Sequence, residues 1–324
     1  MLFAIVIAAL IFGFLNGIHD SSNIVATAIS SRALPPRVAL FLTALAESAG
    51  PFLFGVAVAT TVGKGLIDPT AITPGVVLGA VLAAIAWNLI TWFLGIPSSS
   101  SHALVGGLLG AAVMARGLKV IQAAGLWKVL IALFVSPPLG LLVGFLIMRL
   151  VLFLAAGAPP RVSELFKHLQ VVTAIGLALS HGANDAQKTM GIITLGLVAA
   201  GVLTTFVIPL WVIAASAMSI ALGTALGGWR LIRTLGGRIY KIRPIHGFTS
   251  QTASAAVILG AALLGGPVST TQVVSSAIMG AGAAERMSKV RWSVAQEMLI
   301  AWGLTIPVTA VIAALVYLPI KRIV

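Results

Sequence analysis

The segment ALSHGANDAQKTMGII, residues 178–193, sets a histidine, an asparagine, an aspartate, a glutamine and a lysine between apolar residues. Asp185 in this segment is one of seven acidic residues in a chain of 324. The segment FLNGIHDSSNIVATAIS, residues 14–30, has the same form and contains Asp20. In both segments a polar stretch with glycine separates two apolar halves. Such a polar break predicts a discontinuous helix that is buried in protein or lines a wet cavity.

The composition places these segments in a membrane. Hydrophobic residues make up 59% of the chain and charged residues 8%, and the mean hydropathy is +1.11. Soluble domains contain about 25% charged residues, so we predict a multi-pass protein of a cell membrane. The net charge of +13 comes from lysines and arginines clustered between apolar runs, which follows the positive-inside rule and does not indicate nucleic-acid binding. The absence of cysteine excludes a disulfide framework and a thiolate metal site.

A membrane-spanning helix needs about 20 apolar residues, and six runs meet this requirement clearly. They are residues 38–62, 75–94, 129–156, 202–227, 248–264 and 298–318. Basic connectors separate several of these runs, and the connector at 230–243 contains four arginines and one lysine but no acid. We predict that this connector lies on the cytoplasmic side.

Two further segments contain a second kind of break. GIPSSSSHALVGGLLG, residues 95–110, and GGPVSTTQVVSSAIMG, residues 265–280, each run from glycine through proline and hydroxyl residues to a short apolar helix. Each apolar half is too short to cross a hydrocarbon layer of about 30 Å. We therefore expect re-entrant helices at these two places.

The two kinds of break occur twice in the same order. Asp20 and Asp185 are 165 positions apart, and Pro97 and Pro267 are 170 positions apart. This spacing predicts an all-α polytopic membrane protein made of two homologous repeats, which have inverted topology if an odd number of spans separates them. In secondary transporters, paired broken helices mark the substrate site near the membrane midplane. The predicted repeats are residues 1–157 and 158–324.

The proline breaks contain groups that suit an anion. A helix start presents unpaired N–H donors and the positive end of the helix dipole, and hydroxyls before it add donors for a tetrahedral oxyanion. The alternative is that these hydroxyls only cap the helices, but two matched copies favour a binding site. The predicted anion-binding residues are Ser99, Ser100, Ser101, Ser269, Thr270, Thr271 and, from the aspartate segments, Asn184.

The two aspartates indicate a compensating cation. An acid at the bilayer centre costs about 2.5–3.5 kcal/mol and marks a functional site. Carboxylate, amide and hydroxyl oxygens are suitable ligands for Na⁺, and the alternative is a coupling proton on a buried carboxyl. The predicted cation-binding residues are Asp20, Asn23, Asp185 and Gln187, with the ion itself at Asp20, Asn23 and Asp185.

The remaining polar residues of the apolar runs and breaks are predicted to support the ion site or to have no role in it. For most of these residues the alternative is a helix-packing contact, or, for a lysine, a side chain that reaches the interface. Histidines in separate breaks are only a weak signal for a metal site. The predicted accessory residues are Glu47, Gln251, His19 and Lys188.

An intramembrane hydrolase and an anion channel are the competing classes. Ser180, His181 and Asp185 lie close together in the sequence. Neighbouring residues on one helix point in different directions, whereas a catalytic triad needs its serine and base to face each other. The chain also has no G-x-S-x-G motif, so we do not expect an enzyme. A channel would differ from a transporter in conducting without coupling.

At these residues the sequence resembles the inorganic phosphate transporter (PiT) family. The family signature is a duplicated motif similar to G-A-N-D-x-x-N, followed in each half by P-x-S-[GST]-[ST]-H. The corresponding stretches here are GIHDSSN (17–23), GANDAQK (182–188), PSSSSH (97–102), PVSTTQ (267–272) and, similar to the family's C-terminal region, GAAERMSKVRW (282–292). The resemblance covers nearly the whole chain.

The resemblance implies inverted helical halves and uptake of inorganic phosphate coupled to Na⁺ or H⁺, with no other cofactor. It implies that Asp20 and Asp185 are essential acids, that Glu47 is a functional glutamate, and that Gln251 replaces a second glutamate. Three residues depart from the motif and leave the coupling ion and its stoichiometry open: His19, Lys188 and Gln272.

Sulfate is the alternative substrate. A buried carboxylate that no cation occupies favours hydrogen phosphate, because that anion keeps an O–H donor, which sulfate lacks. The lipid bilayer, phosphate and the coupling cation are the expected partners, and a homodimer is left open.

Overall fold

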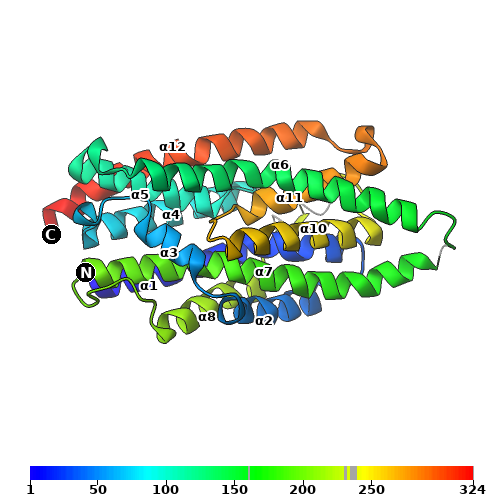
Figure 1. Cartoon of the computed structure of the whole chain (residues 1–324), viewed down its shortest axis with the longest axis horizontal. Coiled ribbons are helices and arrows are strands. Elements are labelled where there is room, and N and C mark those ends of the chain that lie inside the picture. The colour runs from blue at the N-terminus through cyan, green and yellow to red at the C-terminus, as the bar shows by residue number, and fades with distance from the viewer. Residues whose placement is uncertain (160, 230–231, 234–238, 324) are drawn as a thin grey trace.

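The computed structural model is helical throughout the part of the chain that it describes, apart from turns, loops and an isolated bridge between Ile67 and Ile121. The helices run along one long axis, and both termini lie at the same end (Figure 1). The described residues are 1–159, 161–229, 232–233 and 239–323, so Arg230 and Arg238 of the predicted cytoplasmic connector lie outside them. The main helices are α1 (Leu2–Ser30), α2 (Pro36–Phe54), α3 (Ala57–Lys64), α4 (Pro74–Leu94), α5 (Ser100–Arg116), α6 (Ala123–Leu154), α7 (Val162–Ala199), α8 (Leu210–Leu226), α10 (Pro244–Leu263), α11 (Thr270–Glu285) and α12 (Trp292–Ile323).

Helices α1, α2, α4, α6, α7 and α12 are long and apolar enough to cross a membrane. Their outer faces carry large apolar side chains, such as Phe134, Leu142 and Leu146 of α6, each more than half exposed. A contiguous apolar surface of this kind is unfavourable in water but is the expected outer surface of a protein in lipid. The prediction of a multi-pass membrane protein is confirmed.

The polar segments around the two aspartates do not interrupt their helices. Helix α1 continues for 29 residues through Asp20, and α7 continues for 38 residues through Asp185. The prediction of discontinuous helices at 14–30 and 178–193 is therefore wrong. Polar side chains remove no backbone i→i−4 hydrogen bond, so the helix persists wherever neighbouring helices supply partners for the side chains.

The glycines in these segments allow close helix packing. A Cβ on Gly17 would collide with the backbone of Ile220 in α8, and a Cβ on Gly182 would collide with the backbone of Glu47 in α2. Small residues at such positions let two helix backbones approach closely inside a membrane. Glycine thus brings neighbouring helices against the two aspartate segments.

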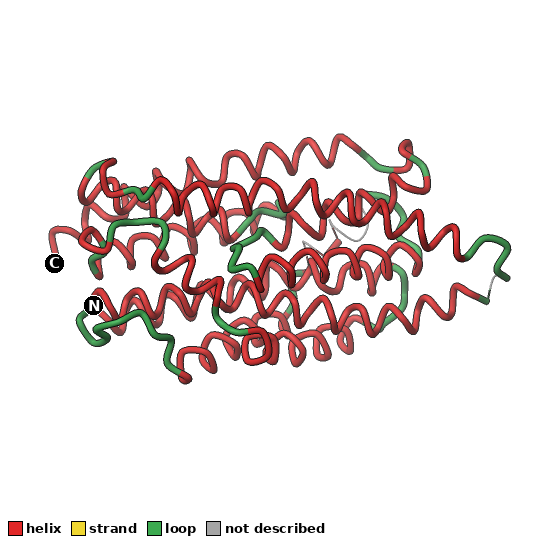
Figure 2. The backbone as a smooth tube through the Cα atoms, in the orientation of Figure 1, coloured by secondary structure: helices red, strands yellow, loops and turns green. Residues whose placement is uncertain are grey.

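The proline breaks are confirmed as non-helical stretches in the middle of the bundle, where α5 and α11 begin. Figure 2 shows loop segments at mid-length, well away from the loops at both ends. The Ser99 and Ser269 hydroxyls accept hydrogen bonds from the first turns of α5 and α11 as N-caps. Proline lacks an N–H, and a capping hydroxyl satisfies the next free donors, so a helix starts there.

Two other predicted boundaries differ from the structure. The single span predicted at 38–62 is divided into α2 and α3 at Gly55, whose φ of +80° ends α2. The span predicted at 202–227 becomes helical only at Leu210. Apolar composition indicated membrane depth in both places but not where the backbone turns.

Helices from the two halves of the chain pack on one another in a reciprocal pattern. Helix α5 packs along α12, and α11 packs along α6; α2 packs along α7, and α8 packs along α1. Figure 1 shows α11 beneath α6 and α5 beneath α12. This exchange is expected of a duplicated unit, and the repeat boundaries and their inverted orientation remain predictions.

An ion-pair cluster holds the outer end of α11. The Glu285 carboxylate accepts hydrogen bonds from Lys289 Nζ at 2.5 Å, from His246 Nε2 at 2.6 Å, and from the Arg243 guanidinium. Partial burial would raise the pKa of Glu285, but the three donors outweigh burial and hold it well below its ordinary value. The cluster joins α11 to the start of α10.

We expect Glu285→Gln to lower the free energy of unfolding by about 1 kcal/mol at neutral pH, because a neutral amide is a weaker acceptor. A carboxylate whose folded pKa is depressed contributes stability above its unfolded pKa and loses it as the pH falls through the folded pKa. The difference in Tm between wild type and variant should therefore stay constant from pH 7 to about 4.5 and shrink as the pH falls from there towards about 2. Thermal unfolding in detergent measures this, and a pH-independent difference would contradict it.

Candidate substrate and cation site

The two aspartates meet at the centre of the bundle. Thr270 is in the first turn of α11. Its Oγ1 donates hydrogen bonds to Asp185 Oδ2 at 3.0 Å and to Asp20 Oδ2 at 3.3 Å. Both aspartates are at most 1% exposed. Carboxylates from α1 and α7 thus reach one hydroxyl at the start of a re-entrant helix.

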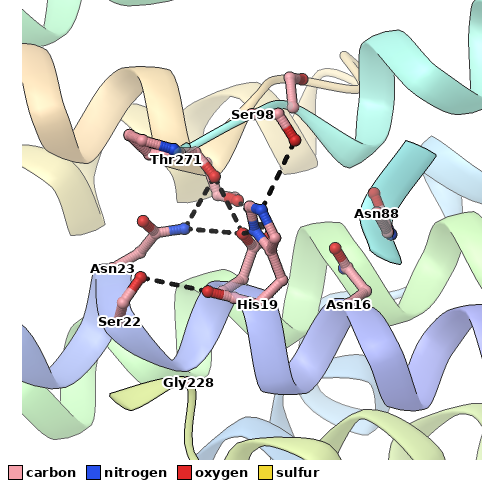
Figure 3. Close-up of polar contacts among 12 residues, drawn as sticks. Asn16, His19, Ser22, Asn23, Asn88, Ser98, Gly228 and Thr271 are labelled. Atoms are coloured by element: carbon pink, nitrogen blue, oxygen red, sulfur yellow. Dashed lines mark hydrogen bonds and ion pairs between the residues drawn. The ribbon is translucent and has the colours of Figure 1, made fainter. Parts of the chain in front are cut away.

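His19 and Asn23 of α1 and Thr271 of α11 lie close together (Figure 3), and all three contact Asp20. Its Oδ1 accepts hydrogen bonds from Asn23 Nδ2 at 3.0 Å and Thr271 Oγ1 at 2.9 Å, and lies 3.0 Å from His19 Nδ1. Asn23 Nδ2 also donates to Thr271 Oγ1 at 2.9 Å. The His19 ring extends to Ser98 Oγ at 3.5 Å, so α1 contacts both proline breaks.

Asp185 has a charged partner on its own helix. The Lys188 ammonium forms an ion pair with Asp185 Oδ1. On the other side, Asn16 Nδ2 donates to Oδ2 at 3.3 Å, and His181 Nε2 lies 3.3 Å from the same oxygen. Both carboxylate oxygens of Asp185 therefore have partners.

Glu47 reaches this centre through His181. His181 Nδ1 lies 2.6 Å from Glu47 Oε1, and Thr224 Oγ1 of α8 donates to Oε2 at 2.5 Å. The other ring nitrogen faces Asp185 and lies 3.8 Å from Asp20 Oδ2. A carboxylate behind an imidazole fixes the ring orientation, so Glu47 holds the ring towards the two aspartates.

The donor set at this centre fits a small hard cation. One oxygen or nitrogen from each of Asp20, His181 and Asp185 lies within 4.8 Å of the others. Four buried amide carbonyl oxygens have no hydrogen-bond partner among the described residues, those of Asn16, Asn23, Asn88 and Asn184. Na⁺, like other hard cations, binds carboxylate and carbonyl oxygens. A buried carbonyl oxygen without a hydrogen-bond donor can be satisfied by such a cation.

The predicted anion-binding hydroxyls gather where α5 and α11 begin, and each of these residues is at most 3% exposed. Ser101 Oγ donates to Val268 O at 2.7 Å, which joins the two proline breaks. The capping alternative is realised at Ser99 and Ser269, whereas Thr270 and Thr271 bond the aspartates. The residues concerned are Ser99, Ser100, Ser101, Ser269, Thr270 and Thr271.

Two predicted amides lie beside this centre with other contacts. Asn184 Nδ2 donates to Gly266 O at 3.1 Å, so its unpartnered atom is an oxygen, which suits a cation better than phosphate. Gln187 Oε1 accepts hydrogen bonds from the backbone N–H groups of Val58 and Ala59, at 2.8 and 3.1 Å. Gln187 therefore caps α3 here, and its predicted role at the cation remains a prediction.

Gln251 of α10 has its side-chain contacts on α7 and α1. Its Oε1 accepts from Thr173 Oγ1 at 2.7 Å, and its Nε2 donates to Thr27 Oγ1 at 3.0 Å. These contacts match the helix-packing alternative. A direct contact with the ion centre is not among them.

Sequence reasoning missed three residues of the centre. His181 lies one helical turn before Asp185, and this i, i+4 spacing places both on one face of α7. Asn16 lies one turn before Asp20 in the same way. Thr224 comes from α8, and nothing in its own segment marks it.

Helical spans, re-entrant helices from both halves and buried carboxylates between them are typical of a secondary transporter. The profile described as "Phosphate transporter family" matches residues 16–313, and the chain belongs to this family. Family membership identifies a transporter and not an enzyme. Ser180 Oγ donates to Gly176 O at 2.8 Å, a backbone carbonyl of its own helix and not a histidine.

Relatives support this membership over the full length. A protein of Bacillus subtilis (strain 168) named "Probable low-affinity inorganic phosphate transporter" is 44% identical over 98% of this chain and 97% of its own. A protein of the same name from Rhizobium meliloti (strain 1021) is also 44% identical, over 98% and 96%. A solved structure named "The sodium-dependent phosphate transporter" superposes with a TM-score of 0.88 at 27% identity, covering 100% of this chain and 99% of that one.

Proposed function

We propose that this chain carries inorganic phosphate across a cell membrane together with Na⁺, by alternating access. The observation that carries the proposal is the approach of Asp20 and Asp185 to Thr270 at the start of a re-entrant helix. The family and the names of its relatives support phosphate as the substrate. The sodium dependence stated in the name of the structural neighbour supports sodium as the coupling ion.

Charge explains why an anion and a cation would enter together. The centre contains the carboxyl groups of Asp20, Glu47 and Asp185 but a single lysine, Lys188, all of them buried. Carboxylates in a low-dielectric site repel phosphate strongly. Na⁺ at Asp20, with amide oxygens of Asn16 and Asn23 as further ligands, would reduce this repulsion. Each ion then lowers the cost of burying the other, which is the physical basis of coupling.

The phosphate itself would bind where α5 and α11 begin. Two helix N-termini supply backbone N–H donors and positive dipole ends, and the hydroxyls of Ser99–Ser101 and Ser269–Thr271 add donors. Thr270 and Thr271 now bond the aspartates, so their hydroxyls connect the anion site with the cation site. A carboxylate nearby can accept the O–H of hydrogen phosphate, which favours phosphate over sulfate.

A proton is the second candidate for the coupling ion. The 2.6 Å contact between His181 and Glu47 joins an imidazole to a carboxyl group in a fully buried place. Such a pair can hold a proton whose uptake compensates the anion as Na⁺ would. In either case the repeats 1–157 and 158–324 would rock about the fixed site.

Proteoliposomes containing the purified protein test the proposal. An inward Na⁺ gradient should raise the initial rate of labelled phosphate uptake about tenfold over an equal K⁺ gradient, and excess sulfate should compete poorly. Stimulation by a pH gradient without Na⁺ would identify the proton as the coupling ion. Uptake that no cation gradient drives, or sulfate uptake in preference to phosphate, would overturn the proposal.

A further inference from the structure

The two halves of the ion centre are not equivalent, and the difference lies three residues after each aspartate. Asn23 follows Asp20 in α1, and Lys188 follows Asp185 in α7. Both side chains make the same contact: Asn23 Nδ2 donates to Asp20 Oδ1 at 3.0 Å, and Lys188 Nζ donates to Asp185 Oδ1. One half therefore presents an amide where the other presents an ammonium group.

We propose that Lys188 is a tethered cation that permanently occupies the Asp185 half of the centre, so that the transporter carries one coupling ion fewer than its duplicated site would hold. This inference rests on the proposed function. It assigns the exchangeable Na⁺ to the Asp20 half, where an amide oxygen is available. The number of Na⁺ ions carried with each phosphate is thus set by Lys188, which is part of the protein and is not transported.

The side chains differ in what they offer an ion. An asparagine has a carbonyl oxygen that can ligate a cation, whereas a lysine has donors and no acceptor. The Asn23 carbonyl oxygen is buried without a hydrogen-bond partner among the described residues. Among the described residues, Asp20 has hydroxyl, amide and imidazole groups as hydrogen-bond or ion-pair partners, and the Asp185 carboxylate lies nearby. The Asp20 half therefore has a free acceptor, the Asn23 carbonyl oxygen. Its described side chains include histidines but no lysine or arginine that contacts Asp20.

The Asp185 half is already compensated. Lys188 is 1% exposed, and its ammonium group ends at Asp185 rather than at a membrane interface. The alternative of a lysine reaching the interface is thereby excluded. The second carboxylate oxygen of Asp185 faces Thr270, Asn16 and His181. A second Na⁺ here would have to displace the ammonium or meet its charge at short range, where repulsion in a low dielectric is strong.

The number of Na⁺ ions carried with each phosphate tests whether Lys188 acts as a tethered cation. Proteoliposomes receive ²²Na⁺ and ³²P-phosphate together, and the ratio of the two initial rates is compared between wild type, Lys188→Asn and the charge-preserving control Lys188→Arg. We expect Lys188→Asn, which copies the Asn23 half, to raise the ratio by about one Na⁺ per phosphate. Lys188→Arg should keep the wild-type ratio. The reciprocal variant Asn23→Lys should lower the ratio and make phosphate binding independent of Na⁺.

A second readout does not depend on transport. Purified protein is heated in NaCl or KCl of equal ionic strength, without phosphate, and the Na⁺-specific increase in Tm is recorded. Lys188→Asn should show a larger Na⁺-specific increase than wild type, and adding Asp185→Asn should cancel the gain.

An unchanged ratio in an active Lys188→Asn protein would overturn the tethered cation while leaving phosphate transport intact. The same rise in Lys188→Arg would also overturn it, since the charge would then be irrelevant. Wild type without Na⁺-dependent phosphate uptake would instead refute sodium coupling, so the two failures are distinguishable. If Lys188→Asn does not accumulate, the Asn23→Lys ratio decides: no decrease in that variant contradicts the inference.

Discussion

Asp20→Asn is expected to reduce Na⁺-driven phosphate uptake about 100-fold while leaving the protein inserted and folded. The substitution keeps the size of the side chain and an oxygen for Thr271 and Asn23, but removes the charge that binds the cation. A hundredfold loss of affinity corresponds to about 2.7 kcal/mol. Removing one carboxylate charge from a buried cation site is enough to cost that amount, because charges attract strongly in a low dielectric.

The measurement is the initial rate of labelled phosphate uptake at fixed Na⁺, normalised to the amount of monodisperse protein. Glu164→Gln is the matched control, because Glu164 of α7 is an exposed acid paired with Lys167 at the protein surface. This control should retain wild-type uptake. Wild-type rates in Asp20→Asn at every Na⁺ concentration would remove Asp20 from the ion site.

Asp185→Asn should abolish coupled uptake too, for a partly different reason. It takes away the partner of the buried Lys188 ammonium. Breaking a buried ion pair by removing one partner costs about 3–5 kcal/mol, so this variant should also lose stability, unlike Asp20→Asn. A lower Tm for Asp185→Asn alone would separate the roles of the two carboxylates.

Proline and polar residues carried different amounts of structural information in this sequence. The breaks before α5 and α11 were predictable, because Pro97 and Pro267 come one or two residues after a glycine and precede capping hydroxyls. Proline alone was not sufficient, since Pro137 and Pro138 lie inside α6. The aspartate segments were misjudged, because a polar side chain leaves the backbone hydrogen bonds of a helix intact. Only the tertiary partners show that these segments stay helical.

The ion centre was predictable in its acids and less so in its neighbours. A carboxylate in an apolar run is costly enough to indicate function by itself, which identified Asp20 and Asp185. The contacts of Glu47 could not be predicted, because they join it to His181 and Thr224, 134 and 177 positions away. Distances of that kind are fixed by how α2 packs on α7 and α8, which no local pattern encodes.

Gly182→Ala is expected to lower the free energy of unfolding by about 2–3 kcal/mol, the cost of overpacking a tight contact, and to impair uptake strongly. A methyl group at this position would lie deep inside van der Waals contact with the backbone carbonyl of Glu47. Backbone cannot move aside as a flexible side chain can, so α2 must shift away from α7. That shift would pull Glu47 from His181, which holds the ring beside the aspartates.

Gly176→Ala is the matched control on the same helix. A Cβ there meets nothing within 4 Å, and alanine is the better helix former by about 1 kcal/mol. The control should be as stable as wild type or slightly more stable. Thermal unfolding in detergent and phosphate uptake measure both variants. If Gly182→Ala matches Gly176→Ala in both, the close approach of α2 to α7 is not what holds Glu47 and His181 at the ion centre.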